Sequence, residues 1–244
     1  MMRKHKNLDK KIWASEDALC LDVQDILLAI VWDFIDFVRN RYNFCIKNSE
    51  VKDIILFGSL TSNFYHRTSD LDICIVLDTE KIIERNPTAN IMQNLKLYYY
   101  DWAMLHHCLV RGRKIDLNCE HLNNARFGGH YRSGGQYSLM YSKWIYKQPV
   151  ISDQEFKKVK KEANQIYKQI MSEYRRVKRG GFNVYDIEQL LSTIIKGRGA
   201  SLDEFYEQTI TPMYLAHRKI KKKGIIDKLR AMGIKNQTKQ FVLK

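Results

Sequence analysis

The stretch FGSLTSNFYHRTSDLDICIVLD, residues 57–78, joins two apolar segments through a polar loop. The segment VKDIILF (51–57) leads into this loop at Gly58, and LDICIVL (71–77) follows it. Both segments are short, rich in β-branched residues and bounded by turn-forming residues, which predicts two strands. KIDLNC (114–119) predicts a third strand, and the roughly 25 residues before it carry spaced Leu, Tyr and Trp residues that favour a crossover helix.

Acidic side chains lie at the start of the second strand and within the third. Side chains alternate along a strand, so Asp70 and Asp72 are expected to point the same way about 7 Å apart. Asp116, placed opposite them, completes a site of three carboxylates. Because such groups repel one another unless they are neutralised, the pattern predicts a pair of Mg²⁺ ions, with Mn²⁺ as an alternative, that also bridge a nucleoside triphosphate such as ATP. The Gly58–Ser59 turn lets backbone amides approach a phosphate, and the Ser59 hydroxyl adds a donor.

The order of these parts resembles the DNA polymerase β superfamily of nucleotidyltransferases: a hydrophobic residue, Gly-Ser, a gap of about ten residues, Asp-Leu-Asp and a later strand carboxylate. The resemblance covers residues 51–119 closely and the remainder in outline. It implies metal ligation by Asp70, Asp72 and Asp116, activation of the attacking hydroxyl by Asp116, and triphosphate binding at Gly58–Ser59. It also implies in-line attack on a nucleoside triphosphate with release of pyrophosphate, a reaction of the EC 2.7.7 type.

One further nucleotide-binding candidate follows the glycine-rich stretch RFGGHYRSGGQY (126–137). Related enzymes often place a lysine over the triphosphate, and Lys143, expected on a short helix, has a comparable place in the order of elements. The glycines predict a flexible loop, interpreted either as a surface hinge or as a flap that contacts the substrate.

Helices are predicted on both sides of this core. Apolar residues at steps of three and four over residues 18–38 predict an amphipathic helix before the first strand. A second such helix begins near Asp153 and stops at Gly180–Gly181. Another ends at KGRG (196–199).

A final helix is predicted to begin with the capping box of Ser201 and Glu204, and Pro212 is expected to kink or interrupt it. We therefore expect an α/β fold: a polymerase-β-like nucleotidyltransferase core, with a small mixed sheet and helices, followed by a C-terminal helical domain. The expected domains are residues 1–151, catalytic with an N-terminal helix, and residues 152–244, helical and basic.

Composition narrows the class of protein. The chain of 244 residues has 45% hydrophobic residues, 3 prolines and no apolar run of the ~18 residues that a membrane span needs. Its 5 cysteines include no Cys-x-x-Cys pair, which argues against a disulfide framework or a cysteine zinc site. The basic start lacks the apolar region of a secretion signal. We expect a globular, cytoplasmic protein of unknown oligomeric state.

The distribution of charge along the chain favours some classes of acceptor molecule over others. Residues 156–244 contain 21 Lys and Arg against 8 Asp and Glu, which is almost the whole net charge of +14. The simplest interpretation is that these basic residues lie on solvent-exposed helix surfaces, but the positive electrostatic field of such surfaces also attracts polyanions. We therefore expect an RNA acceptor, a tRNA or another 3′ end, bound through residues 156–244. The alternatives are a protein- or small-molecule-directed nucleotidyltransferase (toxin-like or antibiotic-modifying), a nucleotide second-messenger synthase, and a non-enzymatic nucleic-acid-binding protein on a decayed transferase scaffold.

Overall fold

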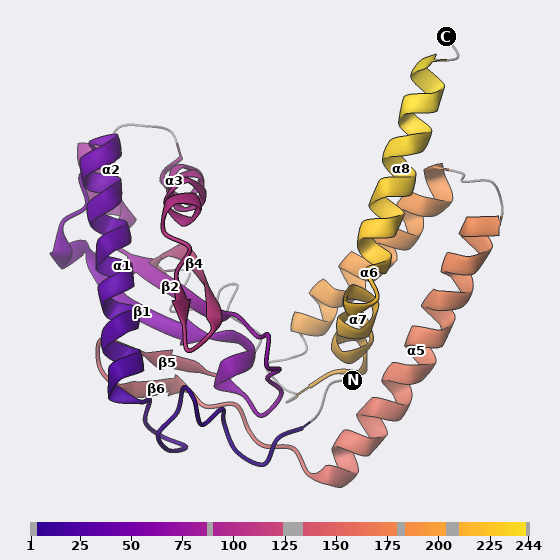
Figure 1. The fold of residues 1–244 in the computed structure, drawn as a ribbon, viewed down its shortest axis with the longest axis horizontal. Coiled ribbons are helices and arrows are strands. Elements are labelled where there is room, and N and C mark those ends of the chain that lie inside the picture. Colours follow the sequence, from indigo (N-terminus) through magenta and orange to yellow (C-terminus); the bar gives the residue numbers. More distant parts are fainter. Residues whose placement is uncertain (1–3, 87–89, 124–133, 180–183, 204–209, 243–244) are drawn as a thin grey trace. The chain divides into compact units, whose positions relative to one another are not determined.

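The computed structural model describes residues 4–86, 90–123, 134–179, 184–203 and 210–242. The chain divides after Gln148 into two compact units, which we call the sheet unit and the helical unit (Figure 1). Within the described residues, no helix combines the length and apolar character needed to cross a membrane.

The sheet unit contains a six-stranded mixed sheet in the order β3-β4-β2-β1-β5-β6. Strands β1 and β2 are antiparallel, whereas β2 and β4 are parallel and are connected through helices α2 and α3. A parallel pair requires such a crossover, because a tight turn can join only antiparallel strands. The strands are β1 (Val51–Phe57), β2 (Leu71–Leu77), β3 (Leu109–Val110), β4 (Arg113–His121), β5 (Gln136–Ser138) and β6 (Lys143–Tyr146).

Among the described residues, helices α1, α2 and α3 accompany the sheet, and two of them cover one of its faces. α1 and α3 pack on the face that carries Ile54, Ile73 and Ile75, all of which are fully buried (Figure 1). Burial of this continuous apolar surface is the main stabilising contribution of the sheet unit. The helices are α1 (Leu21–Tyr42), α2 (Thr79–Arg85) and α3 (Ile91–Leu105), and short 3-10 turns lie at Asn48–Glu50 and Gly58–Thr61.

The opposite face of the sheet carries the predicted carboxylates. Its apolar residues form a smaller buried cluster of Ile55, Phe57, Cys74 and Val76. Because side chains alternate along each strand, the residue that continues this face of β2 toward its start is Asp72. The helix-covered face therefore supplies stability and the opposite face supplies the acidic groups.

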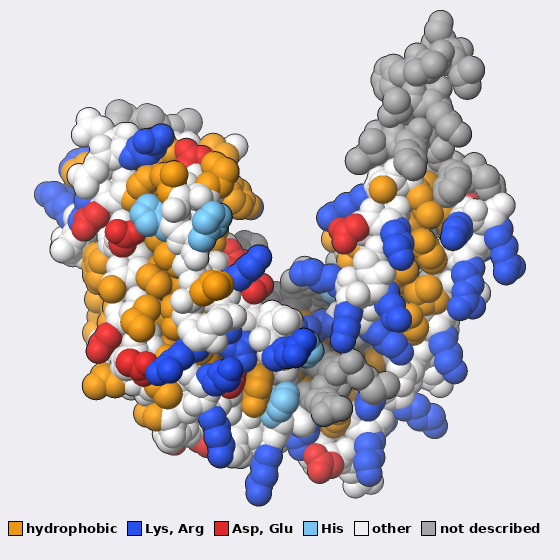
Figure 2. Space-filling model, viewed as in Figure 1, with side chains coloured by type: hydrophobic (Ala, Val, Ile, Leu, Met, Phe, Trp, Pro, Cys, Tyr) orange, Lys and Arg blue, Asp and Glu red, His pale blue; other side chains and the backbone are white. Residues whose placement is uncertain are grey.

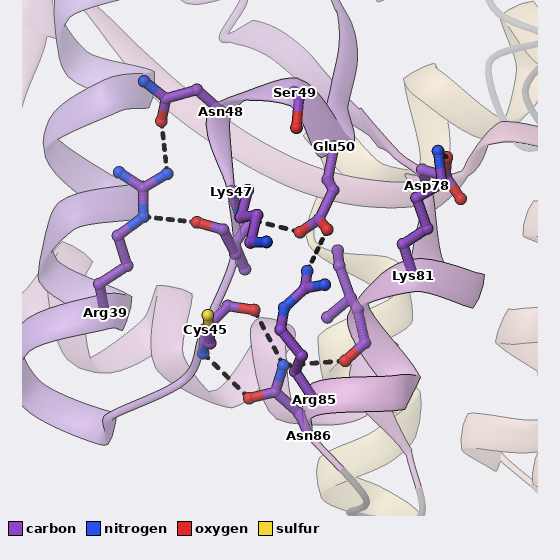
Figure 3. A network of polar contacts seen from close by, with 12 residues as sticks. Arg39, Cys45, Lys47, Asn48, Ser49, Glu50, Asp78, Lys81, Arg85 and Asn86 are labelled. Atoms are coloured by element: carbon purple, nitrogen blue, oxygen red, sulfur yellow. Dashed lines mark hydrogen bonds and ion pairs between the residues drawn. The ribbon is translucent and has the colours of Figure 1, made fainter.

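A polar network fixes the start of β1, as Figure 3 shows. The buried carboxylate of Glu50 accepts a 2.8 Å hydrogen bond from the backbone amide of Lys47 and is paired with Arg85 of α2. Asn86 bonds to both the amide and the carbonyl of Cys45 at 2.9 Å. These bonds attach the α2 end to the segment before β1, at the end of that strand remote from Gly58.

The helical unit consists of α5 (Asp153–Arg179), α6 (Val184–Asp203), α7 (Pro212–Lys222) and α8 (Ile225–Val242). Its buried cluster includes Ile170 and Tyr174 of α5, Ile187 and Ile194 of α6, and Leu229 of α8. Each helix contributes one apolar side, and together these sides form a core separate from that of the sheet unit.

Two predicted helix boundaries in this unit are wrong. α6 continues through KGRG (196–199) and Ser201 to Asp203, so Ser201 is inside a helix and does not cap one. Pro212 starts α7 instead of interrupting a helix, and the Thr211 hydroxyl caps α7 by accepting from the amide of Tyr214 at 3.2 Å. Proline suits the first turn of a helix, because its missing N–H would have no partner there.

The predicted fold class is confirmed: a small mixed sheet with helices precedes a series of C-terminal helices. The short helix expected around Lys143 is wrong, because residues 143–146 form the edge strand β6. Its sequence, KWIY, alternates exposed and partly buried residues and is rich in aromatic and β-branched types, which favours a strand.

Candidate active site

Asp72 and Asp116 are register partners in the adjacent parallel strands β2 and β4. Neighbouring strands lie about 4.8 Å apart, and both residues lie on the sheet face opposite α1 and α3. The flanking residues Leu71 and Ile115 are buried on the helix-covered face, whereas Asp72 is half-buried and Asp116 is exposed. Asp70 lies one residue before β2 and is exposed. The three carboxylates predicted to act together thus lie at the same end of β2 and β4.

The pKa of Asp116 is affected by the neighbouring acidic residue Asp70. Asp116 is exposed as a residue, but neighbouring protein atoms partly desolvate its carboxylate, which raises its pKa, and the negative charge of Asp70 raises that pKa further. The ammonium group of Lys96 on α3 opposes both effects. The same two aspartates raise the pKa of Tyr99, after a larger effect of burial, and the Tyr99 hydroxyl donates to the Ile115 carbonyl at 2.9 Å. Lys96 and Tyr99 of α3 are therefore coupled electrostatically to the acidic group, although α3 packs on the opposite face of the sheet.

The turn that follows β1 presses against Asp72. Gly58 is buried with φ of +82°, a conformation that favours glycine. A Cβ added at Gly58 would overlap the Asp72 Oδ2 atom and lie 2.9 Å from its Cγ. Ser59, the next residue, is half-buried, and its carbonyl accepts a 2.9 Å bond from the hydroxyl of Ser62. The predicted phosphate-binding turn and the predicted metal ligand are therefore in direct contact.

Thr61 fixes this turn, and the sequence interpretation missed it. Its buried hydroxyl lies 2.7 Å from the Gly58 carbonyl and 2.8 Å from the Gly135 carbonyl, so the single proton is shared between two acceptors. Gly134, with φ of +105°, packs so closely that an added Cβ would overlap the Gly58 carbonyl. Two of the glycines that predicted a flexible loop are thus closely packed, while residues 126–133 of that stretch lie outside the described residues. The sequence feature that could have indicated this role is a threonine two residues after Gly58–Ser59.

Lys143 is not brought to the acidic group. It lies on β6, paired with Ser138 of β5, and its charge acts on Asp53 near the start of β1. Four strand spacings, about 19 Å, separate β6 from β4 and its Asp116. Burial raises the pKa of Asp53, while the Ser138 hydroxyl, donating at 2.7 Å, and Lys143 lower it. Lys143 therefore belongs to a separate polar cluster at the other end of β1.

The donor chemistry of the acidic group fits a hard divalent cation, because carboxylate oxygens are the ligands that Mg²⁺ prefers. In the part of the chain that the structure describes, however, no three His, Cys, Asp or Glu side chains are placed to hold a metal ion. The positions of Asp70, Asp72 and Asp116 on the backbone are thus compatible with metal binding, whereas their side chains do not form a closed ligand set.

Comparison with known proteins identifies the class. Residues 37–118 match the family described as the nucleotidyltransferase domain. The matched segment runs from the second half of α1 to β4 and includes Gly58, Asp70, Asp72 and Asp116, but not Lys143. The match is consistent with the polymerase-β-like superfamily that the resemblance implied, and it supports a general nucleotidyl transfer activity. No curated protein and no solved structure matches the chain.

Proposed function

We propose that this protein is a metal-dependent nucleotidyltransferase that moves a nucleoside monophosphate from a nucleoside triphosphate to a hydroxyl group of RNA, with release of pyrophosphate. The observation that carries the reaction type is the register pairing of Asp72 with Asp116 beside the Gly58 turn. Two acidic strand positions and a glycine turn meet where β1 ends and β2 begins, beside β4, and this arrangement suits the binding of a metal-bound triphosphate.

Each residue has a distinct role in this proposal. Asp70, Asp72 and Asp116 would hold Mg²⁺ through their carboxylates, and Asp116 would also accept the proton of the attacking hydroxyl. Backbone amides at Gly58 and Ser59 bind the triphosphate. Mg²⁺, when bound, neutralises charge on the phosphates and on the leaving pyrophosphate.

The acceptor is inferred from the charge on α5. Lysine and arginine side chains outnumber acidic ones across the visible face of the helical unit in Figure 2. Within α5 the separations of four, seven, seven and four residues place five exposed basic side chains on one side of the helix. We call this set the α5 basic row: Lys157, Lys161, Lys168, Arg175 and Arg179.

The α5 basic row lies opposite the apolar side of α5, which includes the buried residues Ile170 and Tyr174. Of the acidic residues of α5, Glu155, Glu162 and Glu173 lie about 100° or more around the helix from the row, and Glu173 is paired with Arg176 at 2.8 Å. Asp153 lies on the side of the row, one turn before Lys157. Among the described residues, no member of the row forms an ion pair. From Lys157 to Arg179 the row extends about 33 Å, long enough to follow several phosphates of a nucleic acid.

A protein or small molecule is the second candidate acceptor, and a cationic small molecule is disfavoured because the basic row would repel it. The decisive test compares two charge-matched triple variants: Lys161→Gln, Lys168→Gln and Arg175→Gln in the row, against Lys10→Gln, Arg41→Gln and Lys47→Gln in the sheet unit. RNA affinity is measured as a function of salt. The row variant is expected to reduce the slope of log affinity against log salt by about two units, and the control by much less. Equal slopes in both variants contradict RNA binding by α5.

A further inference from the structure

The segment before α1 contacts the loop that joins β1 to β2. We call residues 5–13 the strap and residues 58–70 the site loop. The site loop begins with Gly58–Ser59 and ends with Asp70, so its conformation determines where both lie. The match to the nucleotidyltransferase domain begins at residue 37, so the strap lies outside the matched segment.

The strongest contact passes through Arg113 at the start of β4. Its Nη1 donates to the carbonyl oxygens of His66 at 2.8 Å and Ser69 at 3.0 Å, and its Nη2 is bonded to the Asp9 carboxylate. Arg113 is 5% exposed and Asp9 is 7% exposed. A buried guanidinium needs a carboxylate partner, and its fixed fork of donors lets it bind several acceptors at once. Asp9 therefore holds Arg113 where it binds the residue directly before Asp70.

Trp13 holds the other end of the site loop. The indole Nε1 donates to the Leu60 carbonyl at 2.8 Å, two residues after Gly58. Trp13 is 3% exposed and is stacked on Trp144 of β6, with ring centroids 4.7 Å apart and planes 4° from parallel. The rigid stack fixes the direction of the indole N–H, so this hydrogen bond has little freedom to shift.

The middle of the site loop is bound as well. The buried side-chain amide of Asn63 donates to the carbonyls of His5 at 3.1 Å and Lys6 at 3.0 Å, and the His5 amide donates to the Asn63 carbonyl at 2.8 Å. The rings of His5 and Tyr65 are stacked with centroids 4.0 Å apart. The strap thus contacts the site loop at its beginning, middle and end.

We propose that the strap is a positioning element of the active site: Asp9, through Arg113, and Trp13, through Leu60, keep Gly58, Ser59 and Asp70 in register with Asp72 and Asp116. The roles of the positioned residues rest on the proposed function, whereas the restraint of the loop does not. A loop of this length has many conformations when it is released, and a displacement of about 1 Å can cost 100-fold in rate. None of the strap residues touches the reacting groups, so they act only through the loop.

The test uses the full chain and two strap variants, Asp9→Asn and Trp13→Phe, with Asp22→Asn as a matched control. Asp22 is also paired with an arginine, Arg111, but both side chains of that pair are 51% exposed. Hydrogen exchange by mass spectrometry is followed in residues 60–69 and in β2. We expect exchange in residues 60–69 to accelerate about tenfold or more in each strap variant, with β2 and the control unchanged.

Trp13→Phe keeps an aromatic ring to stack on Trp144 and removes the N–H donor together with the second ring of the indole, so it tests the proposal even where Asp9→Asn fails to fold. Unchanged exchange in residues 60–69 of a folded strap variant overturns the proposal. For turnover, we expect kcat to fall about tenfold or more with little change in the KM for RNA, because the acceptor surface lies elsewhere. A wild-type protein that transfers no nucleotide refutes the proposed function, while the exchange data still decide whether the strap positions the loop.

Discussion

Asp72 of β2 and Asp116 of β4 face each other as register partners across two parallel strands. This relationship places two acidic groups side by side on one face of the sheet, because the parallel register of β2 and β4 pairs position 72 with position 116. The energetic consequence is repulsion within the acidic group, to which Asp70 contributes. The site is therefore expected to reduce stability when no cation is present.

Replacing Asp116 by Asn tests this cost. The pKa of Asp116 in the folded protein is raised above its value in the unfolded chain. Asp116 therefore favours the folded state below about pH 4, where its carboxyl group is protonated, and this contribution to stability is lost as the pH rises through the folded pKa. We expect Asp116→Asn to raise Tm by about 1–2 °C at pH 7 and to give no gain at pH 3.5. Calorimetry at the two pH values provides its own control, since an equal gain at both would exclude an electrostatic origin.

The turn after β1 is tested with two glycine variants. Gly58→Ala adds a methyl group that overlaps the Asp72 carboxylate at a positive φ, whereas Gly112→Ala has φ of +75° but no atom within 4 Å of the new Cβ. Both changes are expected to lose about 1 kcal/mol of stability from backbone strain. Gly58→Ala is expected to lose more than this, because Asp72 must move away from the new methyl group. Only Gly58→Ala is expected to abolish binding of a nucleoside triphosphate, measured by titration calorimetry. Normal binding in that variant would place the phosphates elsewhere.

Thr61 provides a prediction about the support of this turn. Thr61→Val keeps the shape of the side chain but removes the hydroxyl that donates to the carbonyls of Gly58 and Gly135. We expect a loss of about 1–3 kcal/mol in the free energy of unfolding, because two buried acceptors lose their donor. Urea denaturation of Thr61→Ser, which retains the hydroxyl, should show a much smaller loss. Similar losses for the two variants would mean that packing of the methyl group dominates.

The polar network around Glu50 is expected to affect the stability of the protein but not its rate of catalysis. Glu50→Gln removes the negative charge that accepts from the Lys47 amide and pairs with Arg85. We expect a lower Tm, by several degrees, since Glu50 is only 2% exposed. The rate of transfer per folded molecule is expected to stay within about twofold of wild type, because the network lies at the far end of β1. A large loss of rate below Tm would show that this end of the sheet influences the site.

The sequence predicted the central strands well, and the reasons are local. The runs at residues 51–57 and 71–77 are bounded by turn residues at both ends, and both strands have these limits. The facing of Asp72 and Asp116 followed from alternation once the strands were parallel. These predictions needed no long-range information.

Features that depend on contacts far apart in the chain were not predicted. The strap is recognised only through the bonds from Asp9 and Trp13 to residues more than 40 positions away. The hairpin of β5 and β6 was missed because its edge strand is short, and Gly134 before it suggested conformational freedom where packing against Gly58 restrains it. KGRG suggested the end of a helix, but α6 continues because tertiary packing overrides the weak propensity of glycine.

The most direct measurement of the central claim is transfer of label from each α-³²P nucleoside triphosphate, with Mg²⁺, to total cellular RNA or total protein. The wild-type chain and Asp72→Asn are compared, and the product is identified by its sensitivity to ribonuclease or protease. We predict that the wild type labels ribonuclease-sensitive material with at least one nucleotide, and that Asp72→Asn labels none. Label confined to protein would contradict the RNA acceptor, and wild-type labelling no greater than that of Asp72→Asn would contradict nucleotidyl transfer at this site.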